Sequence, residues 1–285
     1  MGMLSINTNV GALRAADSAY SVNKSMETSM QRLSSGKRIN GAMDDAAGLQ
    51  ISQRMTAEIR GFHQAARNAA DAQSLLATAE GAIAEQHNIL QRLREIGVQA
   101  ASGTNSTADR AALNTEAQAL EAEISRIADD TTWAEIQILD GSVTNDQFTF
   151  HIGPDGSDTI TFTIPDMGQE VTGGYSIISS NVVTTQALAN TYIGVIDDAI
   201  SVAGTMRQKI GAVMNRLDHT MANLSNMATN LSLAKGRVED ADFAAESANL
   251  ARTQVLQQAS MSMLAQANAS KPVSYTHLTL PTMRT

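Results

Sequence analysis

The chain contains no cysteine, which excludes disulfide bonds, iron–sulfur clusters and zinc sites built on thiolates. Proline is also scarce: four prolines occur, and the first of them is Pro154. Because proline is the strongest helix breaker, the first half of the chain is free to form long helices. Aromatic residues make up 4% of the sequence against 43% for all hydrophobic residues. Small and unbranched apolar side chains suit helix–helix seams better than a globular enzyme core, so no enzyme is expected.

Positive charge is in the minority, and long apolar runs are absent. The net charge of −9 argues against nucleic-acid binding, because no broad surface would neutralise phosphates. No stretch of about 18 apolar residues occurs, so no transmembrane helix and no membrane partner are expected. The start of the chain lacks the charged and apolar regions of a cleavable signal peptide, so any export is expected to proceed without one.

Two long segments carry apolar residues at every seventh position, with small or apolar companions three residues later. The first series comprises Met55, Phe62, Ala69, Leu76, Ile83, Leu90 and Gly97. The second comprises Ala189, Ile196, Ala203, Ile210, Leu217, Leu224, Leu231 and Val238, with Met206, Val213 and Met227 as companions. Such repeats predict a mainly α protein in which two long helices form a coiled-coil rod. Either an antiparallel or a parallel pairing would bury both seams.

Between these segments the sequence predicts a shorter helix and a β-hairpin. A third helix follows the loop at 102–106, and it is expected to fold back onto the first long helix. Apolar residues then alternate at Phe148 and Phe150, and again at Ile160 and Phe162, on either side of a Gly-Pro-Asp-Gly turn. Alternation of this kind is typical of paired strands, so a hairpin is expected at about 147–165.

Both ends of the chain carry narrow apolar stripes that lack a partner in their own half of the sequence. The stripes include Ile6, Val10, Leu13 and Leu33 near the start, and Phe243, Leu250, Leu256 and Met263 near the end. The two segments could pair with each other or with other molecules, and they are the candidate polymerisation residues. We therefore predict a terminal helical domain at 1–42 plus 238–285, and a rod domain at 43–180 plus 181–237.

Acidic residues mark two expected helix starts. Asp44 and Asp45 are placed to cap the first long helix, where carboxylates meet free backbone N–H groups. Glu239, Asp240 and Asp242 precede the last stripe, and helix capping explains them better than a cation site. The five histidines are scattered, so no metal site and no cofactor are expected.

Several motifs resemble the signatures of bacterial flagellins. Residues 31–40 (Gln-Arg-Leu-Ser-Ser-Gly-Lys-Arg-Ile-Asn) with 44–49 (Asp-Asp-Ala-Ala-Gly-Leu) are similar to the N-terminal signature. Residues 237–244 (Arg-Val-Glu-Asp-Ala-Asp-Phe-Ala) are similar to the C-terminal one. The resemblance covers about residues 4–140 and 185–271, and it implies a secreted flagellar filament subunit whose terminal segments fold as neighbouring subunits cover them. Only about 20 residues separate Ile164 from the next helix, so the chain resembles a minimal flagellin without outer domains.

The resemblance also implies partners. They are other copies of the chain, filament cap and hook-junction proteins, an export chaperone at the C-terminus, and a host Toll-like receptor. A patch similar to the flagellin segment that this receptor contacts comprises Gln91, Arg92, Arg94, Glu95 and Ile96, with Glu116 on the next helix. A solvated, salt-bridged helix face is the other interpretation of this patch, and both can hold together.

Two departures from the family pattern stand out. Trp133-Ala134-Glu135 stands where the family has Phe-Asn-Gly, which suggests a different local turn. Residues 272–285 carry two prolines and many hydroxyl side chains in place of an apolar helical end, so this tail is expected to be foreign to the assembly. Two alternative functions stay open: a hook–filament junction protein, which shares terminal features with flagellin, and a flagellin-like cell-surface binding protein that uses the rod as a display stalk.

Overall fold

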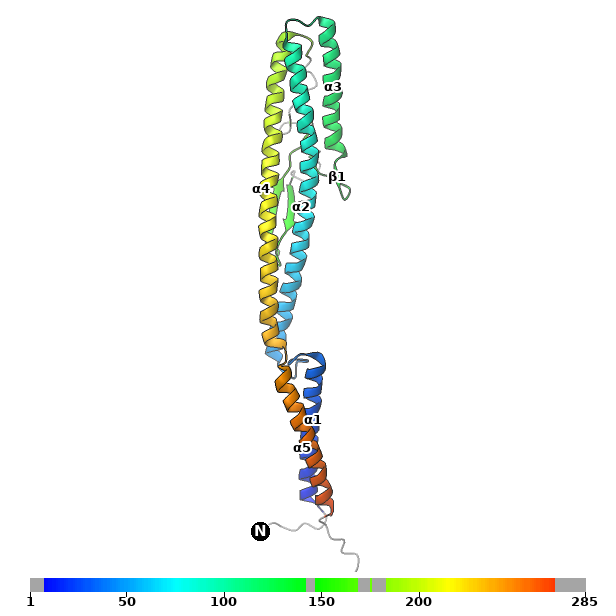
Figure 1. Ribbon diagram of the computed structural model, residues 1–285, viewed down its shortest axis with the longest axis vertical. Helices are drawn as coiled ribbons and strands as arrows, with labels where there is room; N and C mark the ends of the chain where they lie inside the picture. The colour runs from blue at the N-terminus through cyan, green and yellow to red at the C-terminus, as the bar shows by residue number, and fades with distance from the viewer. Residues whose placement is uncertain (1–7, 142–146, 169–174, 176–182, 270–285) are drawn as a thin grey trace, which may run out of the picture. The chain divides into compact units, whose positions relative to one another are not determined.

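The structure is a computed structural model that describes residues 8–141, 147–168, 175 and 183–269 (Figure 1). It is mainly α, as predicted, with two small β-hairpins. Its elements are α1 (Val10–Ser35), α2 (Ala46–Ala101), α3 (Thr107–Asp130), β1 (Thr132–Trp133), β2 (Ile136–Gln137), β3 (Gln147–His151), β4 (Thr159–Thr163), α4 (Gln186–Glu239) and α5 (Phe243–Ala269). The chain divides into a terminal unit, Met1–Thr56 with Ser232–Thr285, and a central unit, Ala57–Leu231.

In the central unit, α2 and α4 pair in opposite directions. Glu80 of α2 accepts hydrogen bonds from Arg207 of α4, and further along α2 the Arg94 Nε lies 2.6 Å from the Asp197 carboxylate. Partner numbers fall along α4 as they rise along α2, so the helices are antiparallel. The predicted coiled coil is confirmed, and of the two orientations that the repeats left open the structure has the antiparallel one.

The predicted seam forms the core of the central unit. Its fully buried members include Ala69, Leu76, Ala79, Ile83 and Leu90 of α2, and Ala189, Ile196, Ala203, Ile210 and Leu217 of α4. Gly97 allows the helices to approach closely, since a Cβ there would lie 2.9 Å from the Ile193 side chain. One companion position was wrong: Met227 is 37% exposed, and Ala228 is buried in its place. A straight α-helix has about 3.6 residues per turn, so two turns take slightly more than seven residues. Over several repeats the buried stripe therefore shifts by one position along the sequence.

The third helix folds back along α2, as predicted. Arg92 of α2 binds Glu116 of α3, and the Gln86 Nε2 donates to the Ile124 carbonyl at 3.0 Å. Again one number falls as the other rises, so α3 is antiparallel to α2. Its start is fixed by a capping box, in which Ser106 and Asp109 satisfy each other's backbone N–H groups.

The predicted hairpin is confirmed, and the structure adds a second one. Strands β3 and β4 pair antiparallel with Phe148 opposite Phe162, within the predicted range 147–165. The added hairpin pairs β1 with β2 through Ala134 and Glu135, whose φ angles are +49° and +70°. Two successive positive φ values are typical of the turn that Asn-Gly prefers. Here two residues with Cβ atoms adopt it.

Buried polar side chains connect the helices of the central unit. The Tyr192 hydroxyl of α4 donates to the Glu121 carboxylate of α3 at 2.7 Å. The Tyr175 hydroxyl donates to the Gln86 Oε1 at 2.9 Å. All four side chains are nearly inaccessible to solvent. Because buried polar groups are costly when unpaired, the first bond fixes how α4 meets α3, and the second fixes Tyr175 against α2.

In the terminal unit, α1 and α5 pair with each other, which is one of the two arrangements that the sequence left open. The Asn9 amide donates to the Ala267 carbonyl at 3.0 Å, and Arg32 at the other end of α1 binds Glu246 at 2.8 Å. The two helices are therefore antiparallel. The residues buried on α1 are the small Ala19 and Ser29, so most of its large apolar side chains lie outside the seam.

The segments that follow α1 and α4 are joined by backbone hydrogen bonds, from Arg38 to the Glu239 carbonyl and from Ala241 to the Gly36 carbonyl. The backbones of Lys37 and Asp240 form an isolated antiparallel β-bridge. The Lys37 ammonium lies 2.5 Å from the carboxylate of Glu239. That ion pair keeps the pKa of Glu239 below its ordinary value. Gly36 ends α1 with a φ of +71°, which glycine adopts without strain.

The acidic caps were only partly predicted. Asp45 accepts from the Gly48 N–H at the start of α2, and Asp242 accepts from the Ala244 N–H at the start of α5. Asp44 instead accepts from the N–H groups of the preceding turn. Glu239 lies inside the end of α4, where lysine side chains bind it, so its predicted capping role was wrong.

Candidate polymerisation and recognition surfaces

The terminal unit exposes large apolar side chains on both of its long helices. Leu13 is 61% exposed on α1 and Phe243 is 69% exposed on α5, whereas Leu76 in the seam of the central unit is fully buried. The other exposed members of the two helices are Val10, Tyr20, Met30, Val255, Leu256, Met261 and Met263. Exposed apolar side chains in such numbers mark a surface that gains stability when another molecule covers it. We call these residues the terminal apolar surface.

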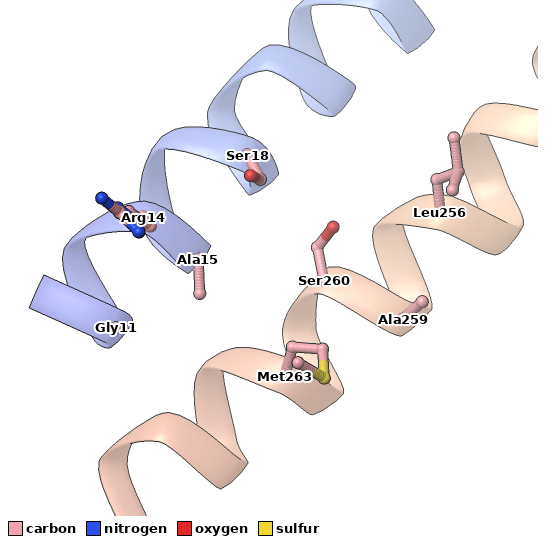
Figure 2. Close-up of a pocket in the computed structure, with 8 residues that line it drawn as sticks. All are labelled: Gly11, Arg14, Ala15, Ser18, Leu256, Ala259, Ser260 and Met263. Atoms are coloured by element: carbon pink, nitrogen blue, oxygen red, sulfur yellow. The ribbon is translucent and has the colours of Figure 1, made fainter. Parts of the chain in front are cut away.

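An open groove of about 420 Å³ lies between α1 and α5 within this surface (Figure 2). Its lining residues are Gly11, Arg14, Ala15 and Ser18 from α1, and Leu256, Ala259, Ser260 and Met263 from α5. Small side chains line both walls, and Leu256 and Met263 add apolar surface on the α5 side, so the groove has room for an apolar side chain of a neighbour.

The structure places most of the candidate polymerisation residues on this surface. Val10, Leu13, Phe243, Leu256 and Met263 are exposed. Leu33 and Leu250 are half-buried. Ile6 lies outside the described residues, as does the tail 272–285.

A polar contact inside the terminal unit escaped the sequence analysis. Glu246 is nearly buried, and it accepts hydrogen bonds from Ser29 at 3.0 Å and from Arg32 at 2.8 Å. The Arg32 side chain holds the pKa of this carboxyl below its ordinary value. The partners are more than 200 positions apart in sequence, so no local pattern could have connected them.

The candidate receptor-contacting residues lie on the central unit, on α2 and α3. Arg92 donates to Glu116 at 2.7 Å and to Glu95 at 3.0 Å, and these carboxylates raise its pKa. Arg94 binds Asp197 of α4 instead, and Gln91 lies 3.4 Å from a ring nitrogen of His87.

Ile96 does not belong to the exposed cluster. Its side chain is fully buried in the helix seam, because it follows Leu93 by three positions and shares that face of α2. Its placement among surface-contact residues was therefore wrong. The remaining five residues, Gln91, Arg92, Arg94, Glu95 and Glu116, form the charged patch of the central unit.

Metal-binding clusters and membrane-spanning helices are both absent from the described residues, 8–141, 147–168, 175 and 183–269. Within these ranges no group of three or more His, Asp or Glu side chains is arranged to hold a metal ion. None of the helices described above is both long and apolar enough to cross a membrane.

The family described as the bacterial flagellin N-terminal helical region matches residues 6–144, and the bacterial flagellin C-terminal helical region matches residues 193–275. A flagellin of Halalkalibacterium halodurans is 41% identical over 92% of this chain and 95% of its own length. A flagellin of Bacillus subtilis is 39% identical over 92% of this chain and 96% of its own length.

One solved structure shows a likeness of fold alone. It is titled as a putative flagellar hook-associated protein from Vibrio parahaemolyticus, with 15% identity and a TM-score of 0.59. The match covers 69% of this chain and all of that chain.

Antiparallel helix pairs with exposed apolar side chains on the terminal helices are typical of a structural protein that assembles with other copies. The chain belongs to the bacterial flagellin family. It is accordingly a structural subunit of the flagellar filament, an extracellular homopolymer. The hook–filament junction and surface-binding alternatives are not favoured.

Proposed function

We propose that filament assembly buries the terminal apolar surface of each subunit against neighbouring copies. The observation that carries this proposal is the contrast in burial between the two units. Apolar side chains on α1 and α5 remain exposed, whereas the α2–α4 seam is covered within the chain. Burying apolar area contributes about 25 cal/mol per Å², so several such side chains per subunit supply a substantial driving force.

Residues Val10, Leu13, Phe243, Leu256 and Met263 carry this role, with Leu33, Leu250 and Ile6 continuing the stripes. The predicted division at 1–42 plus 238–285 and 43–180 plus 181–237 then separates the assembling part from the rod. Filament cap and hook-junction proteins, which contact a filament at its ends, would meet the same surface. The export chaperone would bind the C-terminal segment, and export would proceed without a cleavable signal peptide.

The matched test places the same charge at an apolar and at a polar position of α5. Leu256→Asp should abolish or strongly delay filament growth from seeds, because a carboxylate would be buried against a neighbour. Gln258→Asp adds the same charge at another exposed position of this helix. Electron microscopy and sedimentation of seeded samples measure assembly, and circular dichroism checks that both variants stay helical. Equal critical concentrations for Leu256→Asp and the unsubstituted chain would contradict the proposal.

We also propose that the charged patch of the central unit binds the host Toll-like receptor. It is supported by the exposure of Arg92 and by the carboxylates that hold its guanidinium in one orientation. An oriented arginine can form paired, charge-assisted hydrogen bonds, and such anchors often dominate interfaces. Its donors already bind Glu95 and Glu116, so the receptor would have to approach the whole patch rather than arginine alone.

Reporter cells that carry this receptor provide the test. Monomeric chain should activate them, and Arg92→Ala should weaken activation strongly. Arg126→Ala is the matched control, because Arg126 is also exposed and also binds two carboxylates, on α3. Loss of activation by both variants alike would point to a general charge effect, and no response to the unsubstituted monomer at high dose would refute the proposal.

A further inference from the structure

The segment between α1 and α2 contains the sole Asn-Gly pair of the sequence, Asn40-Gly41. Asparagine is among the thermally labile residues, and its side chain is most open to attack when the next residue is glycine, which has no Cβ to block the approach. Both residues are only half-buried, so water reaches them.

The fold does not require glycine at position 41. A Cβ built there would meet nothing within 4 Å, and the residue does not adopt the left-handed φ that glycine favours. The reactive pair is therefore not a by-product of a turn that requires glycine.

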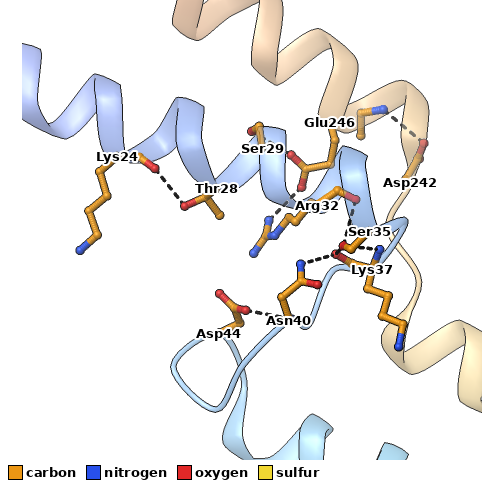
Figure 3. Close-up of polar contacts among 11 residues, drawn as sticks. Lys24, Thr28, Ser29, Arg32, Ser35, Lys37, Asn40, Asp44, Asp242 and Glu246 are labelled. Carbon is orange, nitrogen blue, oxygen red and sulfur yellow. Dashed lines mark hydrogen bonds and ion pairs between the residues drawn. The ribbon is translucent and has the colours of Figure 1, made fainter.

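Both groups that would react are held by hydrogen bonds, of which Figure 3 shows those at Asn40. The Gly41 N–H, whose nitrogen would be the nucleophile, donates to the Asp44 carboxylate at 3.0 Å. The same carboxylate oxygen accepts from the Asn40 N–H at 2.9 Å. The Asn40 side-chain amide, which holds the leaving nitrogen, donates to the Lys37 carbonyl at 3.0 Å.

We propose that Asn40-Gly41 is a spontaneous deamidation site that Asp44 and Lys37 keep unreactive while the connection between α1 and α2 is folded. Attack requires the Gly41 nitrogen to lose its proton, and donation to a carboxylate opposes that loss. The two backbone N–H groups lower the pKa of Asp44, so the carboxylate that holds them remains ionised near neutral pH. The Lys37 carbonyl meanwhile fixes the orientation of the side-chain amide.

The reaction needs only water. The Gly41 nitrogen forms a bond to Cγ of Asn40, the Cγ–Nδ2 bond breaks, and ammonia leaves with the proton from the Gly41 nitrogen. Water then opens the resulting cyclic imide. Opening at Cγ yields aspartate, and opening at the backbone carbonyl yields isoaspartate with an extra backbone carbon.

Either product would disturb this connection. A carboxylate at position 40 cannot donate to the Lys37 carbonyl, and it would lie beside Asp44, where like charges repel. Lys37 also forms the backbone β-bridge to Asp240, which follows α4. A chain that has been unfolded for a long time would thus carry aspartate or isoaspartate at position 40, close to the β-bridge that joins its two terminal segments.

The test compares the rate of conversion at Asn40 in folded full-length chain and in guanidinium chloride at the same pH and temperature. Peptide mass spectrometry in heavy-oxygen water and enzymatic methylation of isoaspartate measure the products. Asn105-Ser106 serves as an internal reference, because the Ser106 N–H likewise donates to a carboxylate, that of Asp109, but serine has a Cβ. We expect Asn40 to convert several-fold faster in denaturant than when folded, and faster there than Asn105.

Two substitutions extend the test. Asp44→Ala should raise conversion of folded chain toward the denatured rate, and adding Gly41→Ala should suppress it again. Circular dichroism checks folding. The proposal is overturned if folded and denatured chain convert Asn40 equally fast, or if Asp44→Ala remains folded and keeps the original rate. Should Asp44→Ala unfold, the ratio for the unsubstituted chain decides alone.

Discussion

Substitution of Tyr192 by phenylalanine tests whether the buried carboxyl of Glu121 depends on its hydroxyl partner. Phenylalanine keeps the ring that α4 buries and removes only the hydroxyl that donates to Glu121 at 2.7 Å. A hydrogen bond to a charged group contributes about 1.5–3 kcal/mol to the free energy of unfolding, and a neutral one about 0.5–1.5 kcal/mol. Tyr192→Phe should therefore cost more stability where Glu121 is ionised than where it is protonated.

The direction of the pH dependence follows from the pKa of Glu121. Burial raises this pKa above its ordinary value of 4.5, and the Tyr192 hydroxyl partly opposes the rise. The folded state then binds a proton more tightly than the unfolded chain, so this group's contribution is fully present below 4.5 and is lost as pH rises through the raised pKa. Without the hydroxyl the pKa rises further, so the stability deficit of Tyr192→Phe should grow with pH.

Tyr175→Phe is the matched control within the same unit. Its hydroxyl is also buried, but it donates at 2.9 Å to Gln86, which does not titrate. Urea unfolding of monomeric chain, followed by circular dichroism from below pH 4.5 to neutral, measures both variants. A deficit of Tyr192→Phe that stays constant with pH, or an equal trend in Tyr175→Phe, would refute the reasoning.

Two further predictions concern local backbone and the terminal unit. Ala134→Asn with Glu135→Gly should raise the free energy of unfolding by roughly 1 kcal/mol, because residues with a Cβ are strained at positive φ; an unchanged urea midpoint would argue against this. Limited trypsin digestion of the monomer should cut at the exposed Arg14, Lys24 and Arg252, and leave a stable product of roughly residues 45–235, because α1 and α5 bury few large side chains. Resistance at all three sites would mean that the α1–α5 pair is stable without neighbours.

The sequence by itself determined the features that depend on local periodicity. Leu76 and Leu217 lie on seven-residue repeats, and a helix pair can bury such repeats along only one face. Phe148 and Phe162 lie in alternating segments around a turn, and only paired strands place those residues on one side. The sequence also predicted the apolar stripes of the terminal helices. Residues such as Leu13 follow helical spacing whether or not their side chains are buried within the chain.

Tertiary structure decided what depends on direction and on distant partners. A seven-residue repeat is the same in both directions, so the antiparallel pairing followed only from two contacts, Glu80 with Arg207 and Arg94 with Asp197. Ile96 lies in a segment of charged surface residues, but its own side chain is buried because the neighbouring helices cover its face of α2. Glu121 meets Tyr192 across 71 positions, and Arg32 meets Glu246 across 214. Contacts of this kind arise from how helices pack, and the sequence around either partner carries no signal of the other.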